Sequence, residues 1–444
     1  MNLLQRAIRG RKSWSETPFW DPERLRYPLY GSISRADREQ IEHDFEGYVA
    51  GIYKRNGPVF SLMMVRQLVF SEARFKFRSL SDGRPGKLFG KPALERLERP
   101  WTNGTTGDLL SRMLQDADLA GNAFHAFHDG RIRRLRPDRV TIVLGSRSQP
   151  DLDMPAGFLP LDVEVAGYIY SPTRLGTDDD LLLLPSQVSH FAPIPDPEAH
   201  YRGMSWLTPV IREISADSAA TLHKKKFFDN AATPNLAVAL KETVTPQQFR
   251  EFMAEMNAAH QGVDNAYKTM YVGGGADVTV VGADLKQLDF RGTQSAGESR
   301  LAAAAGVPPV IVGFSEGLGG SSLNEGNFKA ARRRFVDATM RPLWRNAAGS
   351  LASLVDVPSD AELWFDTRDI AFLRDDSRDI AQIQFTQAQT IRQYVDAGFK
   401  PDSVVAAVEA EDMTLLRHSG LYSVQLQKPG ASTAPTTVDP EQEQ

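Results

Sequence analysis

The sequence predicts an α+β protein assembled from several substructures, and three observations predict it. Apolar residues recur at helical spacing over about residues 45–77, and a second helix begins near Thr105, with Thr106 or Asp108 near its cap. The dipeptide Asp129-Gly130 lies between two runs of alternating polarity and is the commonest signal for a β-hairpin. A chain of 444 residues also exceeds one ordinary core, which indicates about two to four substructures.

The middle of the chain predicts a long helix over residues 206–229, where Trp206, Val210, Ile211 and Ile214 form an apolar stripe. At 1.5 Å per residue this helix spans about 36 Å. A small α+β insertion follows before the chain returns through a second, alanine-rich helix at 289–305. We expect the insertion to contain strands at 236–241, 267–272 and 277–281 and a helix opened by a capping box of Thr245 and Gln248.

The remaining elements follow from the same signals. Strands are expected at 163–170 and 181–184, a helix at 327–354 that Pro342 should kink, a returning strand at 362–366, and helical structure over 376–418. Three prolines within residues 1–44 break any long helix, so we expect a flexible N-terminal arm there. The composition of residues 426–444 is that of a disordered tail.

Composition excludes several classes of function. The 41% hydrophobic and 24% charged residues are typical of a soluble globular protein, and the net charge of −5 argues against a cationic surface for nucleic acid over the whole chain. The absence of cysteine from the sequence excludes disulfides and thiolate chemistry and fits a reducing compartment. The sequence also shows neither a membrane-spanning run nor a signal-peptide apolar region, so we expect a cytosolic chain before assembly.

The segment from Gly306 to Leu343 is the most informative part of the chain. A glycine- and serine-rich loop lies there between two helical segments, and such a loop presents backbone to a ligand better than it builds a core. Gly313-Phe-Ser-Glu-Gly also fits the nucleophile elbow of a serine hydrolase, with Ser315 as nucleophile and His418 downstream. The glycines at 319 and 320 cannot propagate the helix that this elbow needs, so the hydrolase is the alternative hypothesis.

Other candidate sites give weaker signals. Three carboxylates at 178–180 favour a solvated turn over a metal site, and His125 and His128 point to opposite faces of a strand, so they cannot share one ion. The glycines at 317–320 lack the Gly-Lys-Ser/Thr of a phosphate-binding loop. The basic clusters at 224–226 and 332–334 favour solvated or subunit-facing helix surfaces, with phosphate contact as a second possibility. We therefore expect neither an enzyme nor a bound cofactor or metal.

Several short motifs follow one another along the chain, and their order and spacing are informative. Ala120-Gly-Asn-Ala-Phe precedes Leu135-Arg-Pro-Asp-Arg-Val, and Tyr201-Arg-Gly-Met-Ser-Trp-Leu-Thr-Pro begins the first long helix. Phe227-Phe-Asp-Asn-Ala-Ala-Thr-Pro ends that helix, with Ala231 where a glycine is common, and Gly306-Val-Pro-Pro precedes Phe335-Val-Asp-Ala-Thr-Met-Arg-Pro-Leu. In order and spacing these segments, over about residues 50–425, resemble the portal proteins of tailed double-stranded DNA bacteriophages, in particular those of phages with long non-contractile tails.

The resemblance implies a ring-forming subunit with wing, stem, clip and crown parts. Its expected boundaries are a wing over 45–204 with a returning strand within 355–375, stem helices at 205–230 and 290–311, a clip at 231–289, a tunnel loop at 312–326, a long wing helix at 327–354 and a crown at 376–425.

The resemblance also implies a function. A homododecameric ring would stand at one capsid vertex of the virion, where terminase drives DNA into the head and from which the genome later leaves. The implied partners are further copies of the chain, double-stranded DNA bound without sequence specificity, terminase, the major capsid protein and a head-tail adaptor, with assembly in the host cytoplasm. A monomeric DNA-binding adaptor is disfavoured by the acidity of the chain.

Physical reasoning assigns residues to this role. A conduit for sliding DNA must avoid strong phosphate binding, because each neutralised phosphate adds affinity, and a loop of small residues meets that requirement. The residues expected to face DNA are Ser315, Glu316, Gly317, Leu318, Gly319, Gly320, Ser321, Ser322 and Asn324. Ring closure needs two different faces on each subunit, and we expect Trp206, Val210 and Ile214 of the stem to lie at the subunit interface.

Overall fold

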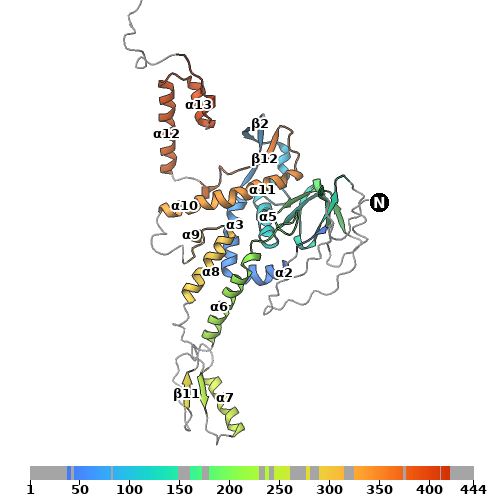
Figure 1. Cartoon of the computed structure of the whole chain (residues 1–444), viewed down its shortest axis with the longest axis vertical. Helices are drawn as coiled ribbons and strands as arrows, with labels where there is room; N and C mark the ends of the chain where they lie inside the picture. The colour runs from blue at the N-terminus through green and yellow to red at the C-terminus, as the bar shows by residue number, and fades with distance from the viewer. Residues whose placement is uncertain are drawn as a thin grey trace, which may run out of the picture. The chain divides into compact units, whose positions relative to one another are not determined.

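The structure is a computed structural model that describes most of the chain. The described residues are 38–41, 45–81, 84–148, 161–172, 180–229, 236–239, 245–260, 277–280, 290–314, 325–373, 377–410 and 412–420. The chain divides into two units, residues 1–373 and 374–444 (Figure 1). None of the described helices combines the length and the apolar character that crossing a membrane requires.

Two helices form the centre of the first unit. α3 (Gly57–Ser71) packs against α5 (Thr106–Ala120), and their facing side chains are buried in the main core. The predicted helix near Thr105 is confirmed, because the Thr105 hydroxyl accepts from the Asp108 N–H and the Asp108 carboxylate accepts from the Thr105 N–H. α5 ends at Gly121, whose φ of 73° allows the chain to turn sharply. The shorter helices before and between them are α2 (Phe45–Gly47), the π-helical η1 (Tyr48–Tyr53) and α4 (Glu95–Glu98).

The first unit also contains three antiparallel sheets. Their strand orders are β1-β6-β7-β8, β12-β2-β3 and β5-β4-β9. The strands are β1 (Arg38–Glu39), β2 (Arg74–Ser81), β3 (Arg84–Phe89), β4 (Ala123–His128), β5 (Arg131–Leu135), β6 (Val140–Ser146), β7 (Val163–Tyr170), β8 (Leu181–Leu183), β9 (Val188–Phe191) and β12 (Ala361–Asp366). The predicted hairpin at Asp129-Gly130 joins β4 to β5, and positive φ values of 50° and 72° at these residues match a type I′ turn. The predicted strand pair β7 and β8 and the returning strand β12 are also confirmed.

The two long helices in the middle of the chain run antiparallel to each other (Figure 1). α6 (Ile211–Asp229) and α8 (Phe290–Ala305) are tied by an ion pair of 3.8 Å between Glu213 and Arg300 and by a hydrogen bond from Lys224 to Gln294. The predicted insertion lies between them and contains β10 (Leu236–Ala239), α7 (Pro246–His260) and β11 (Asp277–Val280), with β10 paired to β11. The expected strand at 267–272 lies outside the described residues.

The predicted long helix after the glycine loop is interrupted near its middle. α10 (Glu325–Phe335) leads into a π-helical turn, η8 (Val336–Met340), and continues as α11 (Arg341–Leu351). Pro342 has no backbone N–H to donate four residues back, so the regular helical pattern cannot pass through this point. The structure thus places the irregularity expected from Pro342 in the five residues of η8.

The second unit is helical, as predicted, but it contains a break. α12 (Ser377–Asp396) and α13 (Pro401–Ala410) are joined by a turn in which Gly398 has a φ of 92°. The ring of Phe399 meets the ring of His418 edge to face at 5.1 Å. The second unit therefore has its own small set of contacts.

Two sequence predictions require correction. The helix expected over 45–77 ends at Ser71, and β2 begins at Arg74. Within β2, Phe75 and Phe77 are buried while Arg74, Lys76 and Arg78 are exposed or half-buried, which is the period of a strand. The arm expected over 1–44 also includes part of a sheet, because Arg38 and Glu39 pair with β6. Residues 1–37 and the expected tail at 426–444 lie outside the described residues.

Candidate functional site

Two of the motifs that resemble portal proteins, Ala120-Gly-Asn-Ala-Phe and Tyr201-Arg-Gly-Met-Ser-Trp-Leu-Thr-Pro, meet in space. Gly121 follows α5, and Gly203 precedes the first long helix, 82 residues later. A Cβ atom on Gly203 would lie 2.2 Å from the carbonyl oxygen of Gly121 and 2.8 Å from that of Ile194. The two backbones therefore approach more closely than any other residue type permits.

A carboxylate from the end of the N-terminal segment holds the same region. Glu39 is 4% exposed, and its carboxylate accepts hydrogen bonds from the backbone N–H groups of His200, Tyr201 and Arg202 at 2.7–3.0 Å. The Arg202 guanidinium in turn pairs with Asp196 at 2.9 Å. These bonds fix the chain immediately before it enters α6.

A buried ion pair connects the long helix α8 to the central helices. The Arg66 guanidinium on α3 donates to both carboxylate oxygens of Asp118 on α5, at 2.8 and 2.9 Å, and also to the backbone carbonyl of Ala305 at the end of α8. Burial raises the pKa of Asp118, and the charge of Arg66 opposes this rise. On the other long helix, Asp217 accepts from the side-chain amide of Asn56 at 2.8 Å. Both long helices are thus attached to the body by buried or partly buried polar contacts.

The segment between α8 and the glycine loop contains two left-handed glycines. Gly306 has a φ of 68° and Gly313 a φ of 78°, and between them lies the short helix α9 (Pro309–Val312). The Thr339 hydroxyl of η8 donates to the carbonyl of Gly306 at 2.7 Å. A Cβ atom on Gly306 would lie 2.7 Å from that hydroxyl oxygen, so glycine is required there for space as well as for conformation. The π-helical turn thereby fixes the backbone at Gly306, ahead of α9.

The residues expected to face DNA cannot be placed by this geometry. The whole set, Ser315, Glu316, Gly317, Leu318, Gly319, Gly320, Ser321, Ser322 and Asn324, lies outside the described residues. The described residue before this segment, Phe314, packs against the main core, and its N–H donates to the carbonyl of Pro309 at 3.1 Å. The described residues after it, Gly326 and Asn327, are exposed.

The residues expected at the stem interface are largely buried within their own subunit. Trp206 and Ile214 are each 3% exposed and belong to the main core of the subunit, and the half-buried Val210 packs against the same core. Their apolar stripe therefore faces the body of its own chain. Residues already buried in this way have little surface left to offer to a neighbouring subunit.

The two histidines of the first hairpin lie on opposite faces of β4, as predicted. His125 is fully buried and His128 is exposed. Burial lowers the pKa of His125 to about 3, with the charges of Arg134 and Arg112 acting in the same direction. Of the three carboxylates at 178–180, only Asp180 lies within the described residues. Within the described residues, no group of three or more histidine, aspartate or glutamate side chains is placed to hold a metal ion.

The basic clusters make local contacts. Arg333 and Arg341 each lie 3.5 Å from Asp337 on the same helical stretch, and both are largely exposed. Lys224 contacts Gln294 of the neighbouring long helix. These contacts agree with the expectation of solvated helix surfaces.

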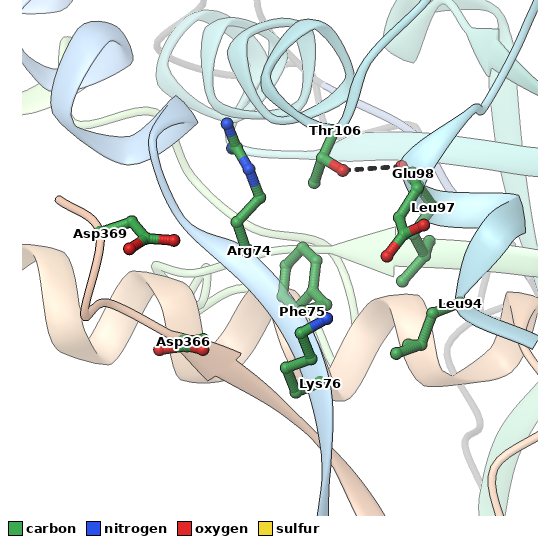
Figure 2. Close-up of a pocket in the computed structure, with 9 residues that line it drawn as sticks. All are labelled: Arg74, Phe75, Lys76, Leu94, Leu97, Glu98, Thr106, Asp366 and Asp369. Carbon is green, nitrogen blue, oxygen red and sulfur yellow. Dashed lines mark hydrogen bonds between the residues drawn. The ribbon is translucent and has the colours of Figure 1, made fainter. Parts of the chain in front are cut away.

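A crevice beside β2 is small and of mixed charge. Figure 2 shows Arg74 and Lys76 of β2 between Glu98 on one side and Asp366 and Asp369 on the other. Its volume is about 130 Å³, below the roughly 300–1,000 Å³ of typical ligand pockets. A crevice of this size and charge balance suits solvent better than a substrate.

The hydrolase alternative loses its structural basis. A nucleophile elbow requires a strand immediately before the serine, whereas residues Pro309–Val312 form a helix that ends at Gly313. The phosphate-cradle hypothesis concerned residues 317–320, which lie outside the described residues.

The comparisons decide the family. A family model described as phage portal protein matches residues 64–399, which is three quarters of the chain. The chain belongs to the phage portal protein family. Members of this family are structural components of the particle, so the prediction of a non-enzymatic portal subunit at the capsid vertex is confirmed and the serine hydrolase is unsupported.

Solved structures show that the predicted portal fold is correct. A chain in the neck of an empty gene transfer agent particle, computed with C6 symmetry, is 21% identical with a TM-score of 0.57, and the match covers 86% of this portal protein and 97% of that chain. A chain in the neck of the native particle, computed with C12 symmetry, is 21% identical with a TM-score of 0.54, covering 80% and 91%. An uncharacterized protein of Rickettsia bellii is 23% identical over 281 residues, covering 62% of this chain and 68% of that protein.

The sequence alone does not predict most of the residues that attach the two long helices and the Gly306 segment to the central helices. Asn56 could have been recognised, because asparagine before Gly-Pro is a typical helix cap, and its side chain accepts from the Val59 N–H. Arg66 and Asp118 are 52 residues apart, and Thr339 is 33 residues from Gly306, so local patterns contain no signal for these contacts.

Proposed function

We propose that this portal protein forms a closed ring of twelve copies through which double-stranded DNA is packaged and later ejected. The observation that carries the proposal is the arrangement around α8. The insertion at 231–289 lies at the first end of this 16-residue helix, and the segment that leads to the loop at 315–324 lies at its other end, about 24 Å away. With α6 and α8 in the wall of a ring, the insertion stands at one opening and the loop lies farther along the bore.

The chemistry of the loop supports passage of DNA without tight binding. Residues 315–324 include three glycines, three serines and one acidic residue, and they include neither lysine nor arginine. A ring repeats every phosphate contact once per subunit, so a cationic loop would hold DNA and oppose sliding. Glycine and serine leave the loop free to adjust to the moving duplex.

The partners follow from the same proposal. The insertion forms the clip that meets terminase during packaging and the head-tail adaptor afterwards, and the wing faces the major capsid protein. The subunit assembles in the host cytoplasm and ends in the virion. Matches to chains in the neck of phage-like particles support this location.

Electron microscopy of the purified full-length chain tests the ring. We expect closed particles with a central hole and twelvefold symmetry in class averages. A protein that stays monomeric at all concentrations, with and without capsid protein present, would contradict the proposal.

Shortening the loop tests the channel. Replacement of residues 315–324 by two glycines should leave ring formation unchanged but reduce the amount of nuclease-protected DNA in assembled particles. Ser315→Ala is the matched control, because it removes one hydroxyl and keeps the length of the loop, and it should package normally. Normal packaging by the shortened variant would show that the loop does not contact DNA.

A further inference from the structure

Helix α3 has an unusual composition for a helix at a protein surface. Its 15 residues, all of them described, include a single charged residue, Arg66, and that side chain is buried against Asp118. Surface helices of globular proteins normally carry charged residues on the side away from the core, whereas a helix that is apolar all round is a buried helix. By composition, α3 is a buried helix.

One side of α3 is nevertheless exposed in the isolated subunit. The side that contains Val59, Leu62, Met63 and Phe70 is buried in the main core. On the other side, three large apolar side chains follow each other at intervals of four residues, with exposed fractions of 43% for Phe60, 41% for Met64 and 58% for Leu68. This spacing places them in one stripe about 12 Å long, at 1.5 Å per residue.

Another long helix of the same unit shows the normal pattern. On α11 the buried residues Leu343, Trp344 and Ala347 alternate with exposed Arg341 and Arg345. The exposed side of α11 thus carries charged residues, whereas the exposed side of α3 carries none. Single exposed apolar residues are common on proteins, but a continuous uncharged stripe marks a contact surface.

The absence of exposed charge on this stripe favours a second copy of the chain over DNA as its partner. DNA requires lysine or arginine side chains to neutralise its phosphates, and α3 exposes neither. A second copy of this chain carries the same net charge of −5, so two copies approach with least repulsion through faces that bear no charge. The uncharged stripe therefore fits a like-charged neighbour.

We propose that Phe60, Met64 and Leu68 form one side of the interface between neighbouring subunits, an inference that rests on the proposed ring. In a ring the contact joins two different faces, so the chain must supply a second apolar surface for the stripe to meet. Two large apolar side chains on other helices of the first unit are exposed, Leu222 of α6 at 52% and Phe328 of α10 at 40%. The stripe takes the place of Trp206 and Ile214, which the body of the subunit already buries.

Single cysteine variants test the proposal, because the natural sequence contains no cysteine to react in the background. Met64→Cys and Leu68→Cys should react with a soluble maleimide in the unassembled subunit and at least about tenfold more slowly in the ring, where reaction requires local opening of the contact. The matched control is Leu184→Cys, at a leucine that is 51% exposed outside α3, and its rate should change little on assembly.

The outcomes of this experiment separate the proposals. Equal labelling of the Met64→Cys and Leu68→Cys variants in ring and subunit would overturn the interface, whether or not another partner covers the stripe in the particle. Protection already present in the unassembled subunit would overturn it as well, because a segment of the same chain, such as residues 1–37, would then be the cover. Failure of the wild-type chain to form any ring would overturn the proposed function and this inference together.

A second measurement identifies the partner surface. A benzophenone attached to the thiol of the Met64→Cys variant and photolysed in the ring should give covalent dimers on a denaturing gel, with the cross-linked peptide on α6 or α10 of the second copy. Cross-links confined to single chains would count against the interface. Leu68→Glu should prevent ring formation while the circular dichroism of the subunit is retained, and Leu184→Glu should still assemble.

Discussion

The side-chain amide of Asn122 forms a closed pair of hydrogen bonds with the backbone of Gly203. The Asn122 Nδ2 donates to the Gly203 carbonyl at 2.9 Å, and the Gly203 N–H donates to Asn122 Oδ1 at 2.7 Å. The same amide donates to the carbonyl of Ala120 and lies 3.0 Å from His190 Nε2, so its hydrogen-bonding groups are fully used. Asn122 thus joins two of the motifs on which the resemblance to portal proteins rests, those that contain Gly121 and Gly203.

Loss of this amide should destabilise the subunit. Asn122→Ala leaves the backbone groups of Gly203 buried without partners, and we expect the free energy of unfolding to fall by about 2–4 kcal/mol, the penalty of one to two unsatisfied buried groups. Denaturant unfolding of the unassembled subunit measures it. Asn346→Ala, at an exposed position of α11, is the control and should change stability by less than about 0.5 kcal/mol. An equal, small effect of both substitutions would show that the Asn122 bonds contribute little.

A second prediction concerns the close approach of the backbones at Gly203. Gly203→Ala would place its Cβ 2.2 Å from the Gly121 carbonyl, so the two segments must separate, and we expect a loss of more than about 3 kcal/mol or failure to fold. Gly349→Ala is the matched control, because a Cβ there meets nothing within 4 Å and lies inside α11. That substitution should raise the thermal midpoint through a gain of about 0.5–1 kcal/mol. A folded, equally stable Gly203→Ala subunit would refute the predicted clash.

Sequence signals that depend on neighbouring residues were reliable in this chain. The turn at Asp129-Gly130 and the cap of α7, where Thr245 and Gln248 bond each other reciprocally, could be predicted because each is decided within four residues. The stripe of Trp206 and Ile214 was also recognised, but an apolar stripe does not say what covers it. The body of the same chain covers it here, and only coordinates distinguish that outcome from a subunit interface.

Signals that depend on distant residues were missed. The sequence predicts helix where β2 lies, because Phe70 and Phe77 continue the helical spacing of apolar residues. The change to the period of a strand shows only when the burial of Phe75 and Phe77 is known. The exposed stripe on α3 could not be predicted either. A helix that is apolar all round has no amphipathic pattern to show which side is buried. The family resemblance compensated for these errors because it rests on the order of motifs and not on any single element.

The ion pair that attaches α8 gives a third prediction. Arg66→Met removes the cation and leaves Asp118 buried and uncompensated, which should cost about 3–5 kcal/mol of unfolding free energy. The double variant Arg66→Met, Asp118→Leu removes both charges and should be less destabilised than Arg66→Met alone. Denaturant unfolding of the wild type, the two single variants Arg66→Met and Asp118→Leu, and the double variant completes the cycle. Strict additivity of the two single changes would show that these side chains do not interact.

The buried histidine of β4 predicts a dependence of stability on pH. Burial lowers the pKa of His125 to about 3 in the folded protein, and neither ring nitrogen has a hydrogen-bond partner within the described part of the chain. The unfolded chain takes up a proton below its ordinary pKa of 6.5, whereas the folded protein does not until pH 3. His125 therefore does not lower the free energy of unfolding above about pH 6.5. Below that pH the free energy of unfolding falls as the pH decreases, by about 2 kcal/mol at pH 5 from this residue.

His125→Leu isolates that contribution. The variant should lose about 2 kcal/mol less than wild type between pH 8 and pH 5, because the leucine takes up no proton in either state. The nearby Asp116, whose pKa burial raises to about 6, acts in the opposite direction and is present in both proteins, so the difference between them reports on His125. At pH 8 the two proteins should be of similar stability, because the substitution removes two unpaired nitrogens together with the packing of the ring. Parallel stability curves for wild type and variant from pH 8 to pH 5 would show that His125 is protonated as readily in the folded subunit as in the unfolded chain.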